Sequence, residues 1–211
     1  MAIVDAGVGS QNAARAAADA IALHRPAWVV SSGFAGALVD DVKRGEFIIA
    51  DSVADTHGNV VSLGPSFAAP QASQPTADGK KPAGPNWHVG RLLTVERLIR
   101  KVSEKRELAA AHSALACDME TFAVAEVCRR ERTKFLSARI ISDAVDDKLP
   151  PEAERLLGQK SLAFKLGAAF GAVLERPSSA LDLWQMREDA LIASDRLAKF
   201  LSGLARQLPV E

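Results

Sequence analysis

The chain has 211 residues, enough for one domain with a substantial core, and 48% of them are hydrophobic and 25% charged. Its 26 basic and 26 acidic residues cancel to a formal net charge of zero, so the composition predicts neither a nucleic acid nor an anionic membrane as a partner. Cys117 and Cys128 suggest neither a disulfide framework nor a metal site, and without a transmembrane or leader-like segment we expect a cytoplasmic protein.

The first third of the chain alternates between strand-like and helix-like segments. Residues 1–6 form a short apolar run, and the alanine-rich residues 10–23 after it predict a helix. Residues 27–36 and 45–55 are rich in β-branched and aromatic side chains, which predicts two strands. This order favours a parallel α/β sheet.

The middle and the end of the chain add a loop and two helices. Residues 64–85 are dominated by Pro, Gly, Ala, Ser and Gln and predict a mobile surface loop. Residues 152–175 predict a helix, and residues 181–208 predict a last, amphipathic helix with an apolar stripe. We therefore expect one domain over residues 1–176, with residues 177–211 as its C-terminal helical extension.

The most informative stretch predicts one strand-helix-strand crossover. Residues 113–119 (SALACDM) and 133–142 (TKFLSARIIS) are short apolar strands, and residues 120–131 between them have helical spacing. A crossover of this kind makes its two strands parallel, and we expect them to be neighbours. The predicted fold is a three-layer αβα domain around a mixed, mostly parallel sheet.

Acidic residues leave the carboxyl ends of both crossover strands. Asp118 and Glu120 follow the first strand and Asp143 ends the second, at the edge where open α/β sheets bind ligands. Burial and a neighbouring charge can keep one carboxylic acid protonated, so that it can give a proton to a leaving group. An ionised neighbour can orient hydroxyls and favour positive charge on a sugar ring. This pairing suits glycosidic bond cleavage, with Asp143 as the acid and Glu120 as the anion.

Three motifs in order extend this interpretation to a family. Residues 31–51 (SSGFAGALVDDVKRGEFIIAD), 116–128 (ACDMETFAVAEVC) and 138–147 (ARIISDAVDD) resemble the purine nucleoside phosphorylase and nucleosidase superfamily, especially 5'-methylthioadenosine/S-adenosylhomocysteine nucleosidases and their hopanoid-associated relatives. The resemblance covers most of the chain up to about residue 175. It implies cleavage of the N-glycosidic bond of an adenosine-like, 5'-modified purine nucleoside. It also implies no cofactor and a homo-oligomer, with a dimer favoured.

The same resemblance implies roles for individual residues. Asp143 matches the acid that protonates the purine at N7, and Glu120 matches the carboxylate that holds the ribose hydroxyls. Met119 matches the methionine that lies against the sugar. Ser142 precedes the acid and is expected to fix its loop. Val95, in the segment TVERLI, falls where relatives place backbone contacts to the purine.

One departure from the family concerns the segment that contains Gly33 and Phe34. In the nucleosidases the position of Phe34 is commonly a serine that reaches towards the ribose or the attacking water. In the phosphorylases this glycine-rich segment helps to hold phosphate. Because Phe offers neither a donor nor an acceptor, hydrolysis is preferred here. Phosphorolysis, with phosphate as co-substrate, stays open as an alternative.

A second departure concerns the start of the sequence. The family usually begins with another strand, whose glutamate activates the water. Residues 4–14 (VDAGVGSQNAA) resemble a later family segment, and removal of a central strand would leave backbone groups unpaired. Either the start was assigned too late, or the water-activating group is lost. The second case motivates another hypothesis, a degenerate homologue that binds nucleosides without cleaving them.

Simpler interpretations apply to the same residues. Asp143 can cap the turn after its strand, and a carboxylate at Glu120 is favoured by the helix dipole in any protein. Asp118 is expected to have a positioning role rather than a chemical one. Gly7 and Gly9 form half of a dinucleotide fingerprint, which leaves a nucleotide-dependent oxidoreductase as the weakest hypothesis.

Overall fold

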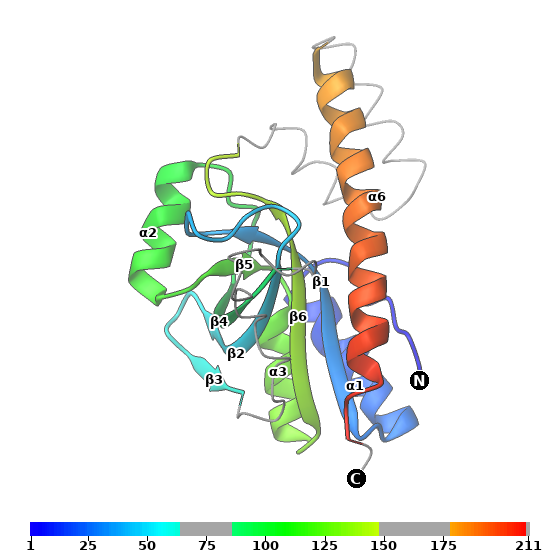
Figure 1. The fold of residues 1–211 in the computed structure, drawn as a ribbon. Coiled ribbons are helices and arrows are strands. Elements are labelled where there is room, and N and C mark those ends of the chain that lie inside the picture. The colour runs from blue at the N-terminus through cyan, green and yellow to red at the C-terminus, as the bar shows by residue number, and fades with distance from the viewer. Residues whose placement is uncertain (64–85, 148–177, 210–211) are drawn as a thin grey trace, which may run out of the picture.

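A computed structural model describes residues 1–63, 86–147 and 178–209 of the chain. Figure 1 shows the helices arranged around a strongly curved sheet. In chain order the elements are α1 (Ser10–His24), β1 (Trp28–Ala37), β2 (Phe47–Asp55), β3 (Val60–Ser62), β4 (Trp87–Thr94), α2 (Val102–His112), β5 (Ala116–Asp118), α3 (Thr121–Arg130), β6 (Lys134–Asp143) and α6 (Ser178–Ala205). The predicted loop at residues 64–85 and the predicted helix at residues 152–175 lie outside the described residues.

The strands form one mixed sheet that closes on itself. Its order is β3-β2-β4-β5-β1-β6, and β2 pairs in addition with β6. The ladders of β1 with β6, β2 with β4 and β4 with β5 are parallel, and the other three are antiparallel. The prediction of a mixed α/β fold is confirmed. The predicted three-layer arrangement is wrong, because the start of β2 pairs with β6 and the twisted sheet closes into a barrel.

The two strands of the predicted crossover are not neighbours, because β1 lies between them. Gly36 of β1 pairs with Cys117 of β5 on one side and with Asp143 of β6 on the other. The pairing with β5 is antiparallel and the pairing with β6 is parallel. The expected direct parallel pairing is therefore wrong. The carboxyl ends of β5 and β6 nevertheless meet, since both lie beside Gly36.

The start of the chain differs from the expectation in one respect. Residues 1–7 have no regular secondary structure, so the expected strand over residues 1–6 does not form, whereas the predicted helix is present as α1. β1 pairs with β6 from Trp28 onwards, but it pairs with β5 only at Gly36 and Ala37. Within the described residues, the first part of β1 thus has a strand partner on one side only.

The inside of the barrel is filled mostly by small and β-branched side chains, together with part of α3. The members of this core are Ala35, Ala37, Val42, Ile48, Ala50, Val53, Val61, Leu92, Ala116, Ala125 and Ile141. Ala125 comes from α3, which also packs against β1, β2, β4 and β6. Close packing of this kind tolerates little movement. The first turn of α3, directly after Glu120, is therefore held firmly against the strands.

The last helix, α6, packs along the outside of the barrel, beside β6 (Figure 1). Phe200 of α6 stacks on Phe47 of β2, with ring centroids 4.4 Å apart. Ala193 and Leu197 are buried in the same cluster, together with Ile140 of β6. These positions recur at helical spacing, so one side of α6 holds the helix to the barrel. In the described part of the chain, no helix is long and apolar enough to cross a membrane.

We predict that Leu197→Ala destabilises the protein by about 2 to 3 kcal/mol, because it leaves a cavity between α6 and the barrel. Leu191→Ala on the same helix is the matched control. Leu191 is 62% exposed, against 8% for Leu197, so its loss should change stability by less than about 0.5 kcal/mol. Chemical denaturation of both variants measures the difference. Equal effects at the two positions would show that α6 is not anchored through this side.

Candidate active site

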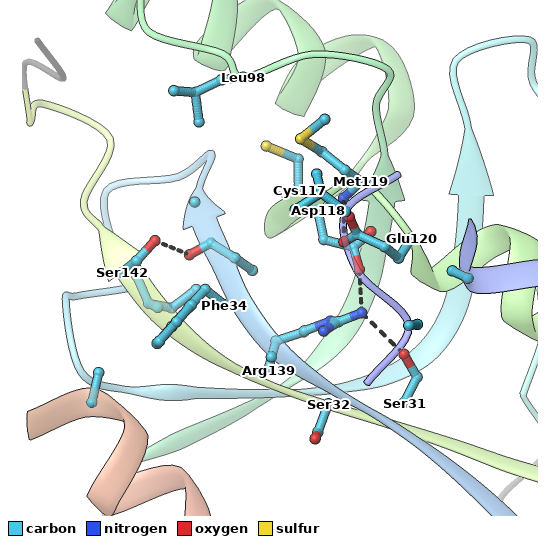
Figure 2. Close-up of a pocket in the computed structure, with 18 of the residues that line it drawn as sticks. Ser31, Ser32, Phe34, Leu98, Cys117, Asp118, Met119, Glu120, Arg139 and Ser142 are labelled. Carbon is cyan, nitrogen blue, oxygen red and sulfur yellow. Dashed lines mark hydrogen bonds and ion pairs between the residues drawn. The ribbon is translucent and has the colours of Figure 1, made fainter. Parts of the chain in front are cut away.

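The ends of β1, β5 and β6 and the segment after β4 surround a cavity of about 1400 Å³. Residues of the N-terminal segment, α1 and α6 complete its wall. Its lining includes every residue for which the sequence predicted a role: Gly33, Phe34, Val95, Met119, Glu120, Ser142 and Asp143. Figure 2 shows several of them around the opening between the strands. The two predicted functional acids, Glu120 and Asp143, therefore face one cavity.

Glu120 stands between β5 and α3, and backbone groups hold its carboxylate. Its Oε1 accepts a hydrogen bond from the Gly9 amide at 2.8 Å, and its Oε2 accepts one from the Met119 amide at 3.3 Å. The Ser10 hydroxyl donates to the Met119 carbonyl at 3.0 Å. Gly9 adopts a φ of 97°, which favours glycine. The early glycines thus form a tight turn that delivers an amide to Glu120, a role that sequence reasoning missed.

The electrostatics of Glu120 favour its protonated form more than usual. Burial raises its pKa above the ordinary value of 4.5, and the charge of Asp118 adds to this. The hydrogen bonds from Gly9 and Met119 and the positive charge of Arg139 act in the opposite direction, without reversing the shift. Holding a carboxylate here therefore costs stability, as is common where a site is built for a ligand.

A buried ion pair between Arg139 and Asp118 lies close to Glu120. Arg139 Nη2 contacts Asp118 Oδ2 at 2.7 Å, with side-chain exposures of 4% and 0%. Asp118 also accepts hydrogen bonds from the Thr94 hydroxyl at 2.8 Å and from the backbone amide of Thr121 at 3.1 Å. Since Thr121 is the first residue of α3, Asp118 fixes the start of that helix. Its contacts are those expected of a positioning residue.

Arg139 is a central member of the site that sequence reasoning missed. It projects from β6 towards Asp118 and Ser31, as Figure 2 shows, and its Nη2 donates to the Ser31 hydroxyl at 3.0 Å. A side chain at Gly33 would place its Cβ 2.4 Å from Arg139 Nη1. Gly33 therefore leaves room for the guanidinium group in this position. The available signal was an arginine within an otherwise apolar strand, because such residues are rarely buried without a partner.

Asp143, at the end of β6, is the second acid of the cavity, and it is paired with a buried lysine. Lys105 Nζ donates to Asp143 Oδ2 at 2.6 Å, and the Ser142 hydroxyl donates to Oδ1 at 2.8 Å. Ser142 also contacts the Ala35 carbonyl oxygen at 3.3 Å, which ties the end of β6 to β1. Both carboxylate oxygens thus have fixed donors, and the side chain has one defined orientation beside the cavity.

The remaining predicted residues contribute surface to the cavity wall. Phe34 is 42% exposed and presents an aromatic side chain. Met119 is half-buried beside Glu120. Val95 is buried, and its amide donates to the Asp118 carbonyl at 2.7 Å. This amide is engaged with β5, and a backbone contact of this segment with a purine stays a prediction.

Cys117 also lines the cavity, but it is not prepared to act as a nucleophile. Burial raises the pKa of its thiol to about 12, and the negative charges of Asp143 and Asp118 add to this. A thiol in that state is unreactive at neutral pH. Among the residues that the structure describes, no three His, Cys, Asp or Glu side chains are grouped so that they could hold a metal ion.

The chain matches one family model and several named proteins. Residues 1–169 match the model of a family described as the phosphorylase superfamily. The chain is 24% identical over 165 residues to the 5'-methylthioadenosine/S-adenosylhomocysteine nucleosidase of Hydrogenovibrio crunogenus, covering 67% of this chain and 66% of that protein. The corresponding nucleosidase of Staphylococcus aureus strain JH9 is 23% identical over 173 residues, covering 76% of both.

A solved structure shares the fold. The S-adenosylhomocysteine nucleosidase of Streptococcus pyogenes, in complex with 5-methylthiotubericidin, has a TM-score of 0.67 and 19% sequence identity. The match covers 97% of this chain and 78% of that one. At this identity the likeness concerns the fold.

We predict that Glu120→Gln makes the protein more stable at about pH 7. The pKa of Glu120 is higher in the folded protein than in the unfolded chain. The stability that protonated Glu120 contributes is therefore fully present below the unfolded-state pKa of 4.5, and it is lost as the pH rises through the folded-state pKa. Gln keeps the volume but cannot ionise, so the gain should shrink as the pH falls towards 4.5. Denaturant unfolding at several pH values measures it.

The matched control is Glu126→Gln on the surface of α3. Glu126 is partly exposed, so the same substitution should give no gain that depends on burial. A Glu120→Gln protein that is less stable than the wild type at neutral pH would contradict the prediction.

Proposed function

This chain belongs to the phosphorylase superfamily, and we propose that it hydrolyses the N-glycosidic bond of a purine nucleoside. One observation carries the proposal: Glu120 and Asp143, which lie near the ends of different strands, line the same cavity in a chain with this family match. Cleavage of a glycosidic bond needs a proton for the departing group and a negative charge for the developing oxocarbenium ion. Two carboxyl groups of fixed orientation can supply both.

In the proposed reaction Asp143 transfers a proton to N7 of the purine as the bond to the sugar breaks. Its orientation supports this role, because Ser142 and Lys105 hold the two oxygens of its carboxyl group beside the cavity. Proton donation of this kind requires a donor at hydrogen-bond distance from the acceptor. Neutralising the base in this way turns it into a better leaving group.

Glu120 is assigned to the sugar. Its oxygens accept hydrogen bonds from the amides of Gly9 and Met119, and each carboxylate oxygen has a further lone pair that can accept one from a ribose hydroxyl. The ionised form also favours the positive charge that develops on the ring. Met119 would lie against the sugar, as the resemblance implies.

Hydrolysis is preferred over phosphorolysis because of the side chains near β1. Phosphate capture depends on donors such as hydroxyls, amides and arginines. Phe34 offers no donor, and Arg139 behind it already contacts Asp118, Ser31 and Thr121. The alternative, a phosphorylase that binds phosphate at another part of the cavity, makes a different product.

An adenosine-like substrate with a modified 5' position is supported by two observations. The names of the matched proteins specify 5'-methylthioadenosine and S-adenosylhomocysteine. The cavity of about 1400 Å³ exceeds the common range of roughly 300 to 1000 Å³ for small-molecule sites. It therefore leaves room for a substituent beyond the ribose.

The direct test incubates the protein with 5'-methylthioadenosine, S-adenosylhomocysteine, adenosine and inosine, with and without phosphate. We expect adenine to be released from the 5'-modified nucleosides without phosphate, and chromatography of the products measures it. Ribose 1-phosphate formed only when phosphate is present would identify a phosphorylase instead. Nucleoside binding without any release of base would support the degenerate homologue.

We predict that Asp143→Asn lowers kcat by about 100-fold or more, while the nucleoside dissociation constant changes by only a few-fold. Asn keeps the shape of the side chain but has no carboxyl proton to give. Steady-state kinetics and equilibrium binding provide the two measurements. Asp146→Asn is the control, because Asp146 lies three residues further on with its side chain 70% exposed. A near-normal rate for Asp143→Asn would exclude Asp143 as the acid.

A further inference from the structure

Lys105 is the one residue of helix α2 that is fully buried. Lys105 is 1% exposed, whereas the side chain of Arg106, the next residue, is 54% exposed. Lysine is almost never fully buried unless its charge is paired. No feature of the α2 sequence marks Lys105 as different from its neighbours, so the reason for its burial lies in what it contacts.

The ammonium group of Lys105 is directed at the acid of the cavity. Nζ lies 2.6 Å from Asp143 Oδ2 and 2.8 Å from the carbonyl oxygen of Ala144. Two further ionisable groups act on this region, Asp147 after β6 and Cys117 on β5. Asp147 accepts a hydrogen bond from the Ala144 amide, and the Cys117 thiol is neutral. Asp143 is therefore the direct ionic partner of Lys105.

Lys105 can act on a ligand only through Asp143. Ser142 and Asp143 line the cavity, whereas Lys105 is not part of the lining. The carboxyl group thus has the cavity on one side and the ammonium on the other. An ammonium in this place cannot bind the substrate, but it can determine when a proton is present on the acid.

Stability alone is a weak reason for such a pair. The free energy lost by removing two charges from water offsets much of their mutual attraction. Apolar side chains of similar size are often at least as stabilising. Beside a cavity the pair has another property. Nζ lies at hydrogen-bond distance from Oδ2, so a proton can pass directly between the two groups. A modest change of charge in the cavity can then move the proton from Nζ to Oδ2.

We infer that Lys105 is a positioning residue that supplies the proton which Asp143 passes to the departing purine, an inference that rests on the proposed function. An N–H bond of the ammonium breaks as an O–H bond forms on Asp143. The proton of that carboxyl group bonds to N7 of the purine, while the glycosidic bond breaks and its electron pair stays on the base. The water that adds to the sugar releases a proton, which restores the ammonium.

A leaving group that needs no proton separates this role from a structural one. 4-Nitrophenyl 5-methylthio-β-D-ribofuranoside has the same sugar as 5'-methylthioadenosine, but its phenolate departs without protonation at neutral pH. Loss of proton supply should therefore slow only the purine nucleoside. A general collapse of the site would slow both substrates alike.

The experiment compares Lys105→Met and Lys105→Gln with the wild-type protein on 5'-methylthioadenosine and on the nitrophenyl riboside. We expect kcat for the nucleoside to fall by about 100-fold, and that for the riboside to change by less than about three-fold. Arg106→Gln is the matched control on the same helix, and it should leave both rates unchanged. Thermal unfolding checks that each variant is folded.

Distinct outcomes overturn the inference and the proposed function. If the wild-type protein releases no base from any nucleoside, the proposed function fails. If the wild-type protein is active but the Lys105 variants lose neither rate, or lose both equally, the inference about Lys105 fails while the function stands.

A second measurement needs no variant, so it holds even if neither substitution folds. Rates of the wild-type protein are measured in mixtures of H₂O and D₂O for both substrates. Two protons moving together, from Lys105 to Asp143 and from Asp143 to the base, give a curved dependence on the deuterium fraction for the nucleoside but not for the riboside. A linear dependence for both substrates would overturn the relay.

Discussion

The register of the strands at Gly36 is the constraint on which the site depends. At this residue β1 pairs with β5 on one side and with β6 on the other, so Cys117 and Asp143 lie beside the same residue. A Cβ at Gly36 would come within 2.9 Å of Asp143 Oδ2, which leaves little room for any side chain there. Because Glu120 follows β5 directly, this register brings the two acids to one cavity although their strands do not pair.

Two buried cations hold the acidic residues around the cavity in place. Arg139 neutralises Asp118, which fixes the start of α3 and therefore the position of Glu120. Lys105 neutralises Asp143 at the end of β6. Glu120 is the exception, because backbone amides rather than a direct ion pair hold its carboxylate. The site thus contains two fixed, paired charges and one carboxylate whose charged form is disfavoured by burial.

Apolar packing around the site offsets the free energy that is needed to keep these charged groups buried. The barrel interior, α3 and the docked face of α6 are apolar and well buried, so they can stabilise a fold that keeps several charged groups out of water. In the proposed reaction a proton donor and a sugar-binding anion must have fixed places before the substrate arrives, and such fixed orientation commonly lowers stability. The oligomeric state stays a prediction, as does the domain boundary near residue 176.

The sequence by itself determined the local features of this protein. The alanine-rich stretch of α1, the apolar runs of β5 and β6 and the acids that follow them, Glu120 and Asp143, were all readable, because periodicity and motifs are local properties. Closure of the barrel, the place of β1 between β5 and β6, and the partners Lys105 and Arg139 were decided only by the tertiary structure. Lys105 is 38 residues from Asp143 along the chain, and strand order and burial depend on such distant contacts, which no local pattern records.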